Sequence, residues 1–289
     1  MLVHIKKIIN DAVKRKYAVG AFNVNNLEIL MSVLRAAEKQ RSPVIIQATE
    51  GAIAYTGLGE LIALASEGAA EVSVPVALHL DHGHSPKLIH EAIKSGFSSV
   101  MIDASDKSFE ENVKLTKQVV SWAKSNDVWV QAELGRLSGS EDWLSVGKGA
   151  DFLTEPVEAV EFIEATGINA FAPSVGNYHG VAKILEKKKL TLDLRRIAAI
   201  AKVAGVPLVL HGASGFPDKQ IKAAIKAGIR VINIDSELRI SFTEALRKFM
   251  RENKEVYDPR KILEPSMAAM QKVVERKMVV FGSKGRAGT

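Results

Sequence analysis

The chain has 289 residues, of which 47% are hydrophobic and 25% are charged, and its formal net charge is +6. This composition suits one large globular domain or two small ones, and the absence of cysteine excludes disulfides, thiolate zinc sites and a cysteine nucleophile. No apolar run approaches the roughly 18 residues of a membrane span, and the amino terminus lacks the apolar core of a signal peptide. We therefore expect a cytoplasmic protein with no membrane partner.

Eight short apolar or β-branched segments recur along the chain and are predicted strands. In chain order they are Ala18–Val24, Pro43–Thr49, Pro75–Asp81, Phe97–Ala104, Val128–Leu134, Ala170–Gly176, Pro207–His211 and Arg230–Asp235. The amphipathic segments between them are predicted helices: Asn26–Glu38, Gly59–Ala70, Pro86–Lys94, Phe109–Ser125, Pro156–Thr166, Leu192–Ala204 and Asp218–Ala227. Alternating strands and helices predict a parallel sheet, and eight units are the count of a (β/α)8 barrel. A doubly wound sheet is the alternative, but no G-x-G-x-x-G turn follows the first strand.

Two segments are longer than the usual loops of such a fold. Arg136–Thr154 is of a length that is typical of functional or disordered loops, and we expect it to be a mobile loop over an active site. Tyr178–Lys189 is a second insertion, rich in lysine.

The chain is expected to be one domain, 1–289, which ends in helices. Glu237–Asn253 is the last predicted helix of the barrel, and an extra helix follows at about Pro265–Lys277. Residues 282–289 are expected to be frayed. The basic residues are spread along helices without any helix-turn-helix, zinc-finger or RNA-binding motif, so we expect a solvated surface and no nucleic-acid partner.

Polar residues stand at or just beyond the end of every predicted strand. In order they are Asn23, Thr49 with Glu50, Asp81 with His82, Asp103, Glu133, His179, His211, and Asn233 with Asp235. In barrel enzymes the catalytic groups come from the carboxyl ends of several strands. Eight polar ends are more than the onset of loops explains, and they predict one active site at the mouth of the barrel.

Three histidines among these residues indicate a metal site. His82, His179 and His211 follow the third, sixth and seventh strands, and three imidazoles that leave one position open match a catalytic zinc site. Asp81 directly precedes His82 and would act either as a general acid/base or as a group that orients a ligand histidine. The strand-end carboxylates Asp103 and Glu133 would bind a second cation or pair with a lysine.

Two glycine- and hydroxyl-containing turns indicate a phosphate site. Gly212–Gly215 follows the seventh strand and Asn233–Ser236 follows the eighth, which are the loops that frequently bind phosphate in barrels. A metal at the same mouth would polarise a carbonyl and stabilise an enediolate, which suits aldol cleavage or isomerisation. The chemistry of the residues does not separate these two reactions.

Over nearly its whole length the chain resembles the class II, metal-dependent ketose-bisphosphate aldolases. Seven ordered segments carry the resemblance: Gly20–Asn23, His79–Gly83, Gly96–Asp103, Ala132–Gly135, Gly176–Gly180, Leu210–Gly215 and Ile232–Ser236. The resemblance implies that Asp81 is the proton donor and acceptor. It implies that the Zn²⁺ ligands are His82, His179 and His211. It also implies an alternative cation position, which maps to Asp103 and Glu133.

The resemblance also implies a set of substrate contacts. Those of the ketone phosphate map to Gly180, Gly212, Ala213, Ser214, Asn233, Ile234, Asp235 and Ser236, and Asn23 is a further substrate-binding residue. The aldehyde-phosphate end maps to Thr49, where many relatives carry serine. Glu141 corresponds to a mobile-loop glutamate that transfers a proton at the ketone carbon, and Arg260 resembles an arginine that reaches the distal phosphate.

The implied reaction is the reversible cleavage of a ketohexose 1,6-bisphosphate to dihydroxyacetone phosphate and glyceraldehyde 3-phosphate. Fructose 1,6-bisphosphate is the expected substrate, because glycolysis is the commoner role. Tagatose 1,6-bisphosphate, which differs only at C4, is the alternative, and a barrel that binds sugar phosphate without catalysis is a third reading. The resemblance further implies a homodimer or homotetramer.

Overall fold

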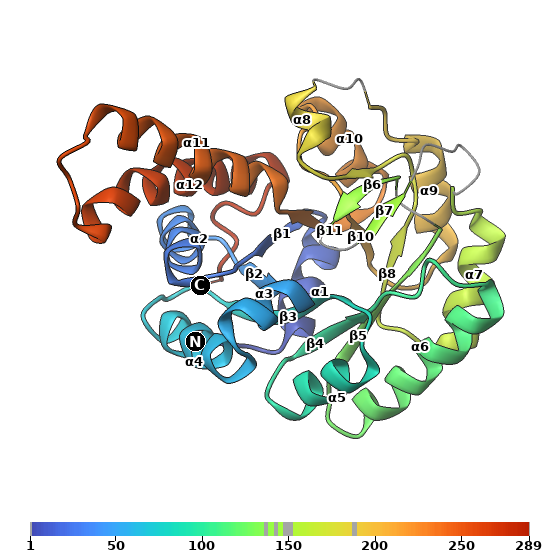
Figure 1. The fold of residues 1–289 in the computed structure, drawn as a ribbon. Helices are drawn as coiled ribbons and strands as arrows, with labels where there is room; N and C mark the ends of the chain where they lie inside the picture. Colours follow the sequence, from blue (N-terminus) through green and yellow to red (C-terminus); the bar gives the residue numbers. More distant parts are fainter. Residues whose placement is uncertain (1, 136–137, 142–143, 147–152, 187–189, 289) are drawn as a thin grey trace.

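Eight parallel strands close into a barrel surrounded by helices (Figure 1). This computed structural model describes residues 2–135, 138–141, 144–146, 153–186 and 190–288. The strands of the barrel are β1 (Val19–Asn23), β2 (Val44–Ala48), β3 (Val76–Gly83), β4 (Ser99–Ile102), β5 (Trp129–Leu134), β8 (Ala170–Pro173), β10 (Leu208–Leu210) and β11 (Ile229–Ile234). They follow one another around the barrel in chain order, and β11 pairs with β1. The predicted (β/α)8 barrel is therefore confirmed, and the doubly wound alternative is wrong.

The helices between the strands pack on the outside of the barrel. They are α2 (Leu27–Gln40), α3 (Glu50–Thr56), α4 (Leu58–Ala70), α5 (Pro86–Lys94), α6 (Phe109–Lys124), α7 (Pro156–Thr166), α8 (Ala182–Leu185), α9 (Leu194–Val203) and α10 (Asp218–Ala227). Three of them, α5, α7 and α10, begin and end at the predicted residues. Proline at the first turn of α5 and α7 explains this agreement, because its fixed φ suits a helix start.

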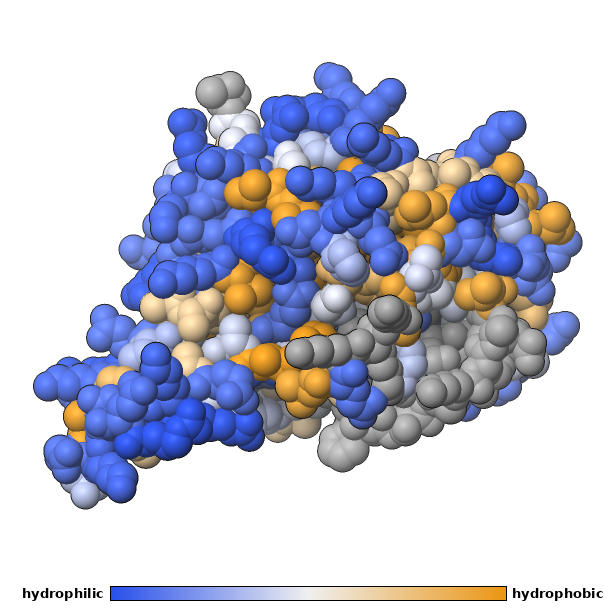
Figure 2. Space-filling model, turned by 90° about the horizontal axis from the view of Figure 1, so that it is seen from above, coloured by the Kyte–Doolittle hydropathy of each residue, from blue (hydrophilic) through white to orange (hydrophobic). Residues whose placement is uncertain are grey.

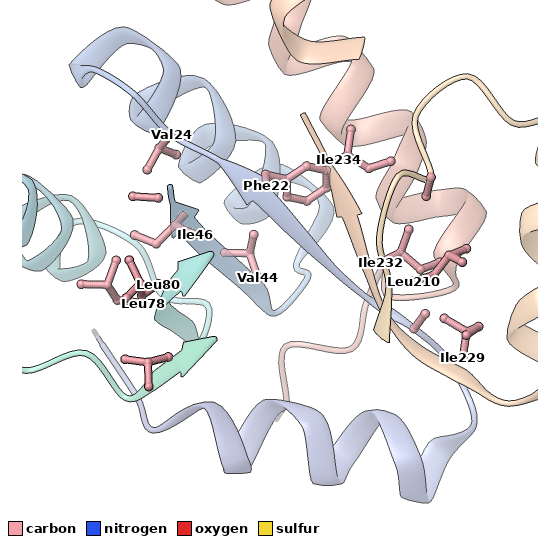
Figure 3. Close-up of a cluster of buried hydrophobic side chains, with 14 of the residues drawn as sticks. Phe22, Val24, Val44, Ile46, Leu78, Leu80, Leu210, Ile229, Ile232 and Ile234 are labelled. Carbon is pink, nitrogen blue, oxygen red and sulfur yellow. The ribbon is translucent and has the colours of Figure 1, made fainter. Parts of the chain in front are cut away.

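Side chains of the strands alternate between two apolar clusters. Phe22, Ile46 and Leu78 belong to the large cluster between the sheet and the helices, which Figure 3 shows in part. Their neighbours Ala21 and Ile45 belong to a smaller cluster inside the barrel. Because successive side chains of a strand point to opposite faces, every second residue from these inner positions also points into the barrel.

A helix at the amino terminus closes one end of the barrel. Helix α1 (Ile5–Arg15) buries Ile5, Ile8, Ile9 and Ala12 in the same cluster as the inner residues of the strands. Leu2 forms a bridge with Val76 at the start of β3, so the segment lies at the amino-terminal ends of the strands. The polar strand ends therefore lie at the opposite, open end.

The predicted loop 136–154 contains two short strands. β6 (Ser138–Glu141) pairs with β7 (Leu144–Val146), and β6 also pairs in parallel with β9 (Tyr178–His179). The segment thus lies beside the strand that carries His179, over the end of the barrel where β8 ends. Residues 136–137, 142–143 and 147–152 lie outside the described part, as do 187–189 of the second insertion.

The last two helices form an arm that projects from the barrel (Figure 1). These helices are α11 (Ser236–Glu252) and α12 (Pro259–Phe281), and α12 returns along α2. Helix α12 begins six residues before the predicted Pro265, because Asp258 caps it by accepting a hydrogen bond from the backbone N–H of Arg260. Figure 2 shows that the surface of the arm is mostly hydrophilic.

The carboxyl-terminal segment is attached to α2 up to residue 288, where fraying was expected. The N–H groups of Gly285 and Ala287 donate to the carbonyls of Gln40 and Arg41, both at 2.9 Å. These carbonyls end α2 and would otherwise lack partners. Among the described residues, no helix is long and apolar enough to cross a membrane.

Candidate active site

A pocket opens at the carboxyl ends of the strands and collects most of the predicted site residues. It is lined by Asn23, Asp81, His82, His179, Gly180, His211, Gly212, Ser214, Asn233, Asp235 and Ser236. The alternation along each strand explains this grouping: Asn23 follows the inner residue Ala21 by two positions, and Asn233 follows Val231 in the same way.

Asp81 lies in the pocket within a ring of amide groups. Its side chain is buried, and its Oδ2 accepts hydrogen bonds from Asn23 Nδ2 at 2.8 Å and Gln47 Nε2 at 3.0 Å. Its Oδ1 accepts a hydrogen bond from Asn233 Nδ2 at 3.2 Å. A buried carboxylate is costly unless it is hydrogen-bonded, and N–H donors stabilise its ionised form. The pocket therefore holds a buried carboxylate whose two oxygens both accept hydrogen bonds from side-chain amides.

The three histidines meet beside this carboxylate. Each of His82, His179 and His211 offers a ring nitrogen, and these nitrogens lie within 4.8 Å of one another. His82 Nε2 is 2.9 Å from His211 Nδ1, so these two nitrogens face each other across a very short gap. The irregular pairing between β3 and β4 and the positive φ of His82, +44°, turn this side chain into the mouth. Three converging imidazoles fit a divalent cation.

The other nitrogens of His82 and His211 face groups that would orient the rings. His82 Nδ1 lies 2.6 Å from Asp103 Oδ2, and His211 Nε2 lies 2.6 Å from the side-chain amide of Gln131. A histidine that binds metal through one nitrogen carries a proton on the other, which needs an acceptor. The carboxylate of Asp103 is such an acceptor, and the amide of Gln131 becomes one when its oxygen faces His211.

Replacing Gln131 by leucine should weaken zinc binding by about 10- to 100-fold, because His211 would lose the acceptor that fixes its orientation. Competition between the protein and a chromogenic chelator measures this affinity directly. Gln131→Glu is the matched control, since it keeps an acceptor at the same place and should retain zinc. Equal zinc affinity in Gln131→Leu and the wild type would contradict the assignment.

Asp103 and Glu133 form a second group with His82. Oxygen and nitrogen atoms of the three residues lie within 4.8 Å of one another, which fits the predicted alternative cation position. Asp103 pairs with His82 and with Ser105, whose hydroxyl donates to Oδ1 at 2.7 Å. Burial opposes ionisation of Asp103, but the hydrogen bond and charge of His82 outweigh it and lower the pKa of Asp103.

His79 is a buried residue of β3, two positions before Asp81. Its Nδ1 lies 2.9 Å from the hydroxyl of Ser99, and burial together with the nearby His82 lowers the pKa of His79 to about 3. A neutral imidazole at this position adds no positive charge beneath the three-histidine group.

Two loops form the predicted phosphate end of the pocket. Gly212 has φ +55°, and a Cβ at this position would meet the backbone of Tyr178 at 2.8 Å, so only glycine lets these segments approach. The hydroxyl of Ser214 accepts a hydrogen bond from the N–H of Asp235 at 3.4 Å, which joins the two loops. The side chains of Ala213 and Ile234 are buried in the outer cluster, so these two residues offer only backbone groups.

Besides Asp103, Glu133, Ala213 and Ile234, which are described above, Thr49 and Arg260 are predicted residues that do not line this pocket. Thr49 lines a neighbouring pocket with Tyr55 and Arg239, and its hydroxyl caps α3 by accepting from the N–H of Ala52 at 3.2 Å. The side chain of Arg260 is 91% exposed on the arm. Glu141 belongs to β6, but its side chain lies outside the described part of the structure.

Comparisons with known proteins identify the family of the chain. Residues 3–286 match the family model described as fructose-bisphosphate aldolase class-II. A fructose-bisphosphate aldolase of Geobacillus stearothermophilus is 44% identical over 289 residues, which are 99% of each chain. The structure of the YdjI aldolase from Escherichia coli K12 matches with a TM-score of 0.86 at 36% identity over 100% of both chains. A fructose-bisphosphate aldolase from Campylobacter jejuni matches with a TM-score of 0.80 at 26% identity, covering 98% of this chain and 96% of that one.

The barrel and its mouth define a metal-dependent lyase that acts on a phosphorylated sugar. The chain belongs to the class II fructose-bisphosphate aldolase family. The predicted family and the predicted enzyme class are confirmed, and fructose-bisphosphate cleavage is the activity that the family assigns to this site. The third reading, a barrel without catalysis, is set aside.

Proposed function

We propose that Asp81 is the general base that accepts the proton of the substrate's C4 hydroxyl as the C3–C4 bond of fructose 1,6-bisphosphate breaks. The supporting observation is the ring of amide donors from Asn23, Gln47 and Asn233, which holds a buried carboxylate beside the three histidines. In the reverse direction the protonated Asp81 returns the proton to the aldehyde oxygen.

Zn²⁺ is the cation proposed for His82, His179 and His211, because three neutral imidazoles are a ligand set of catalytic zinc. When bound, a divalent cation polarises the carbonyl of the substrate and offsets the negative charge that develops there. Asp103 and Glu133 are proposed to hold a second cation position with His82.

The ketone phosphate is proposed to bind between the loop 212–214 and the turn 233–236, with Gly180 at its side. Backbone N–H groups there can approach an anion closely. Thr49 and its pocket are proposed for the aldehyde end, next to the main pocket. Glu141 is proposed to transfer a proton at the ketone carbon, which rests on the family resemblance and the pairing of β6 with β9.

The protein is proposed to act as a cytoplasmic homodimer or homotetramer. Helix α12 begins at the far end of the arm, away from the end of β11 (Figure 1). Arg260 is its second residue, and the side chain of Arg260 is almost fully exposed. A neighbouring subunit's pocket is therefore a more suitable place for this arginine than its own.

A comparison of turnover with fructose and tagatose 1,6-bisphosphate tests the proposed role of Asp81. We expect kcat/KM for fructose 1,6-bisphosphate to exceed that for tagatose 1,6-bisphosphate by at least about tenfold, because inverting C4 moves the reacting hydroxyl relative to the rigidly held Asp81. Turnover of both sugars by the purified zinc-loaded protein measures this ratio. A ratio below one would assign the tagatose substrate instead.

A further inference from the structure

A fully buried lysine lies at the contact between the arm and the barrel. Lys277 of α12 has no exposed surface, and its Nζ lies 2.6 Å from Oε1 of Glu237, the second residue of α11. Burying an ammonium and a carboxylate carries a large desolvation cost, which their attraction repays only when the geometry is good and further hydrogen bonds form. Such a pair is therefore expected to make further hydrogen bonds.

Glu237 Oε1 has a second partner in the phosphate loop. It accepts a hydrogen bond from the backbone N–H of Gly215 at 2.7 Å. Gly215 directly follows Ser214, and Glu237 directly follows Ser236, and both serines line the pocket. This hydrogen bond thus connects the two loops, and each of its two residues directly follows a serine that lines the pocket.

We propose that Glu237, with its charge balanced by Lys277, is a positioning residue for the ketone-phosphate subsite. Its carboxylate fixes the loop that follows β10, so that the N–H groups of 212–214 stay aimed into the pocket. The inference rests on the phosphate subsite proposed above and adds the device that holds it in shape.

The charges around Glu237 fit this role. An uncompensated carboxylate beside a phosphate dianion would repel it, and Lys277 supplies the opposite charge at 2.6 Å from Oε1 of Glu237. The guanidinium of Arg276, 3.5 Å from Glu237 Oε2, adds to this compensation. The N–H of Gly215 is directed at Glu237, so it is not among the donors of the phosphate site.

Two double variants separate the hydrogen bond from the ion pair. Glu237→Gln with Lys277→Met keeps an acceptor for the N–H of Gly215, whereas Glu237→Met with Lys277→Met removes it. Neither leaves a buried charge unpaired, so both should fold, which thermal unfolding checks. Calorimetric titration of the zinc-loaded proteins with dihydroxyacetone phosphate measures binding at the subsite.

The Met/Met variant should bind dihydroxyacetone phosphate about tenfold more weakly than the Gln/Met variant, the effect of a hydrogen bond to a positioned loop. A merely structural pair would change the unfolding temperature of both variants without separating their affinities. Ser214→Ala is measured in parallel, because it probes the subsite itself. If the two double variants bind dihydroxyacetone phosphate equally well and Ser214→Ala binds it more weakly than the wild type, the role of Glu237 is overturned but the phosphate subsite is not. If the affinity of Ser214→Ala is also that of the wild type, and the two double variants again bind equally well, the proposed phosphate subsite is overturned too.

Discussion

Replacing Asp81 by alanine is expected to lower kcat for fructose 1,6-bisphosphate cleavage by at least about 100-fold, the usual contribution of a positioned general acid/base. The substrate's C4 hydroxyl would then have to lose its proton to water, which has no fixed position beside the histidines. Asn23, Gln47 and Asn233 would lose the carboxylate that they surround, but they are neutral and carry no unpaired charge. Formation of glyceraldehyde 3-phosphate in a coupled assay measures the loss.

The same variant decides between the two roles that the sequence left open for Asp81. An acid/base can be removed without loss of bound zinc, whereas a residue that orients a ligand histidine cannot. The structure favours the first role, because Nδ1 of His82 already faces Asp103 at 2.6 Å. Zinc content should therefore stay at the wild-type level. Turnover within tenfold of the wild type, or loss of zinc together with activity, would contradict the acid/base assignment.

A matched change in the amide ring provides the control. Gln47→Met has nearly the same volume and removes one of the two donors to Oδ2 of Asp81. Asn23 still donates to that oxygen, so we expect a loss smaller than that of Asp81→Ala. An equal loss in both variants would mean that Gln47 does more than support the carboxylate.

The barrel could be predicted because each of its strands and most of its helices have a recognisable local sequence pattern. A short apolar run such as 74–78 between amphipathic helices favours a buried strand, and eight such repeats leave few topologies. The site could be predicted because it lies where strands end. Asp81, His82 and His211 interrupt apolar patterns, and such groups are too costly to bury without a partner or a metal.

Other site residues carry no such signal. Gln47 lies one residue before the end of β2 and Gln131 lies three residues before the end of β5, and in the sequence they look like ordinary polar interruptions. Their roles appear only when strand alternation and the closed barrel place them against Asp81 and His211. A count of inward-facing positions from the first inner residue of each strand would have found both.

The packing of helix α1 and of the tail could not be predicted for a different reason. Helix α1 has a clear amphipathic pattern, but its polar neighbours give no hint that its apolar face closes the end of the barrel. The tail 282–288 is polar and glycine-rich, as frayed ends are. It is ordered because the carbonyls at the end of α2 need donors, and that requirement is visible only in three dimensions.

Removal of the metal should abolish activity, and this is the other large effect expected of the protein. Dialysis against a strong chelator should lower turnover by on the order of 10³-fold or more, because polarisation of the carbonyl by a cation is worth several kcal/mol. Adding Zn²⁺ back should restore it. The metal-free protein should also unfold at a lower temperature, since a ligand that binds only the folded state stabilises it by mass action. Both changes are followed on the same sample.

Single variants locate the effect in the three-histidine group. His179→Ala should mimic the chelator, with loss of both zinc and turnover, because two imidazoles hold zinc much less firmly than three. His90→Ala, an exposed histidine of α5 outside the group, is the control and should keep both. Loss of activity without loss of zinc in His179→Ala would give this histidine another function.

Borohydride distinguishes the metal mechanism from the other way of stabilising a carbanion. A lysine that forms a Schiff base with the ketone is trapped by reduction as a stable adduct, which mass spectrometry detects. Among the described residues, those that line the main pocket are amides, histidines, carboxylates, serines and glycines, and none of them is a lysine. Incubation with dihydroxyacetone phosphate and borohydride should therefore leave the mass of the protein unchanged. An adduct on any lysine, together with activity that survives the chelator, would replace the three histidines as the source of electrophilic catalysis.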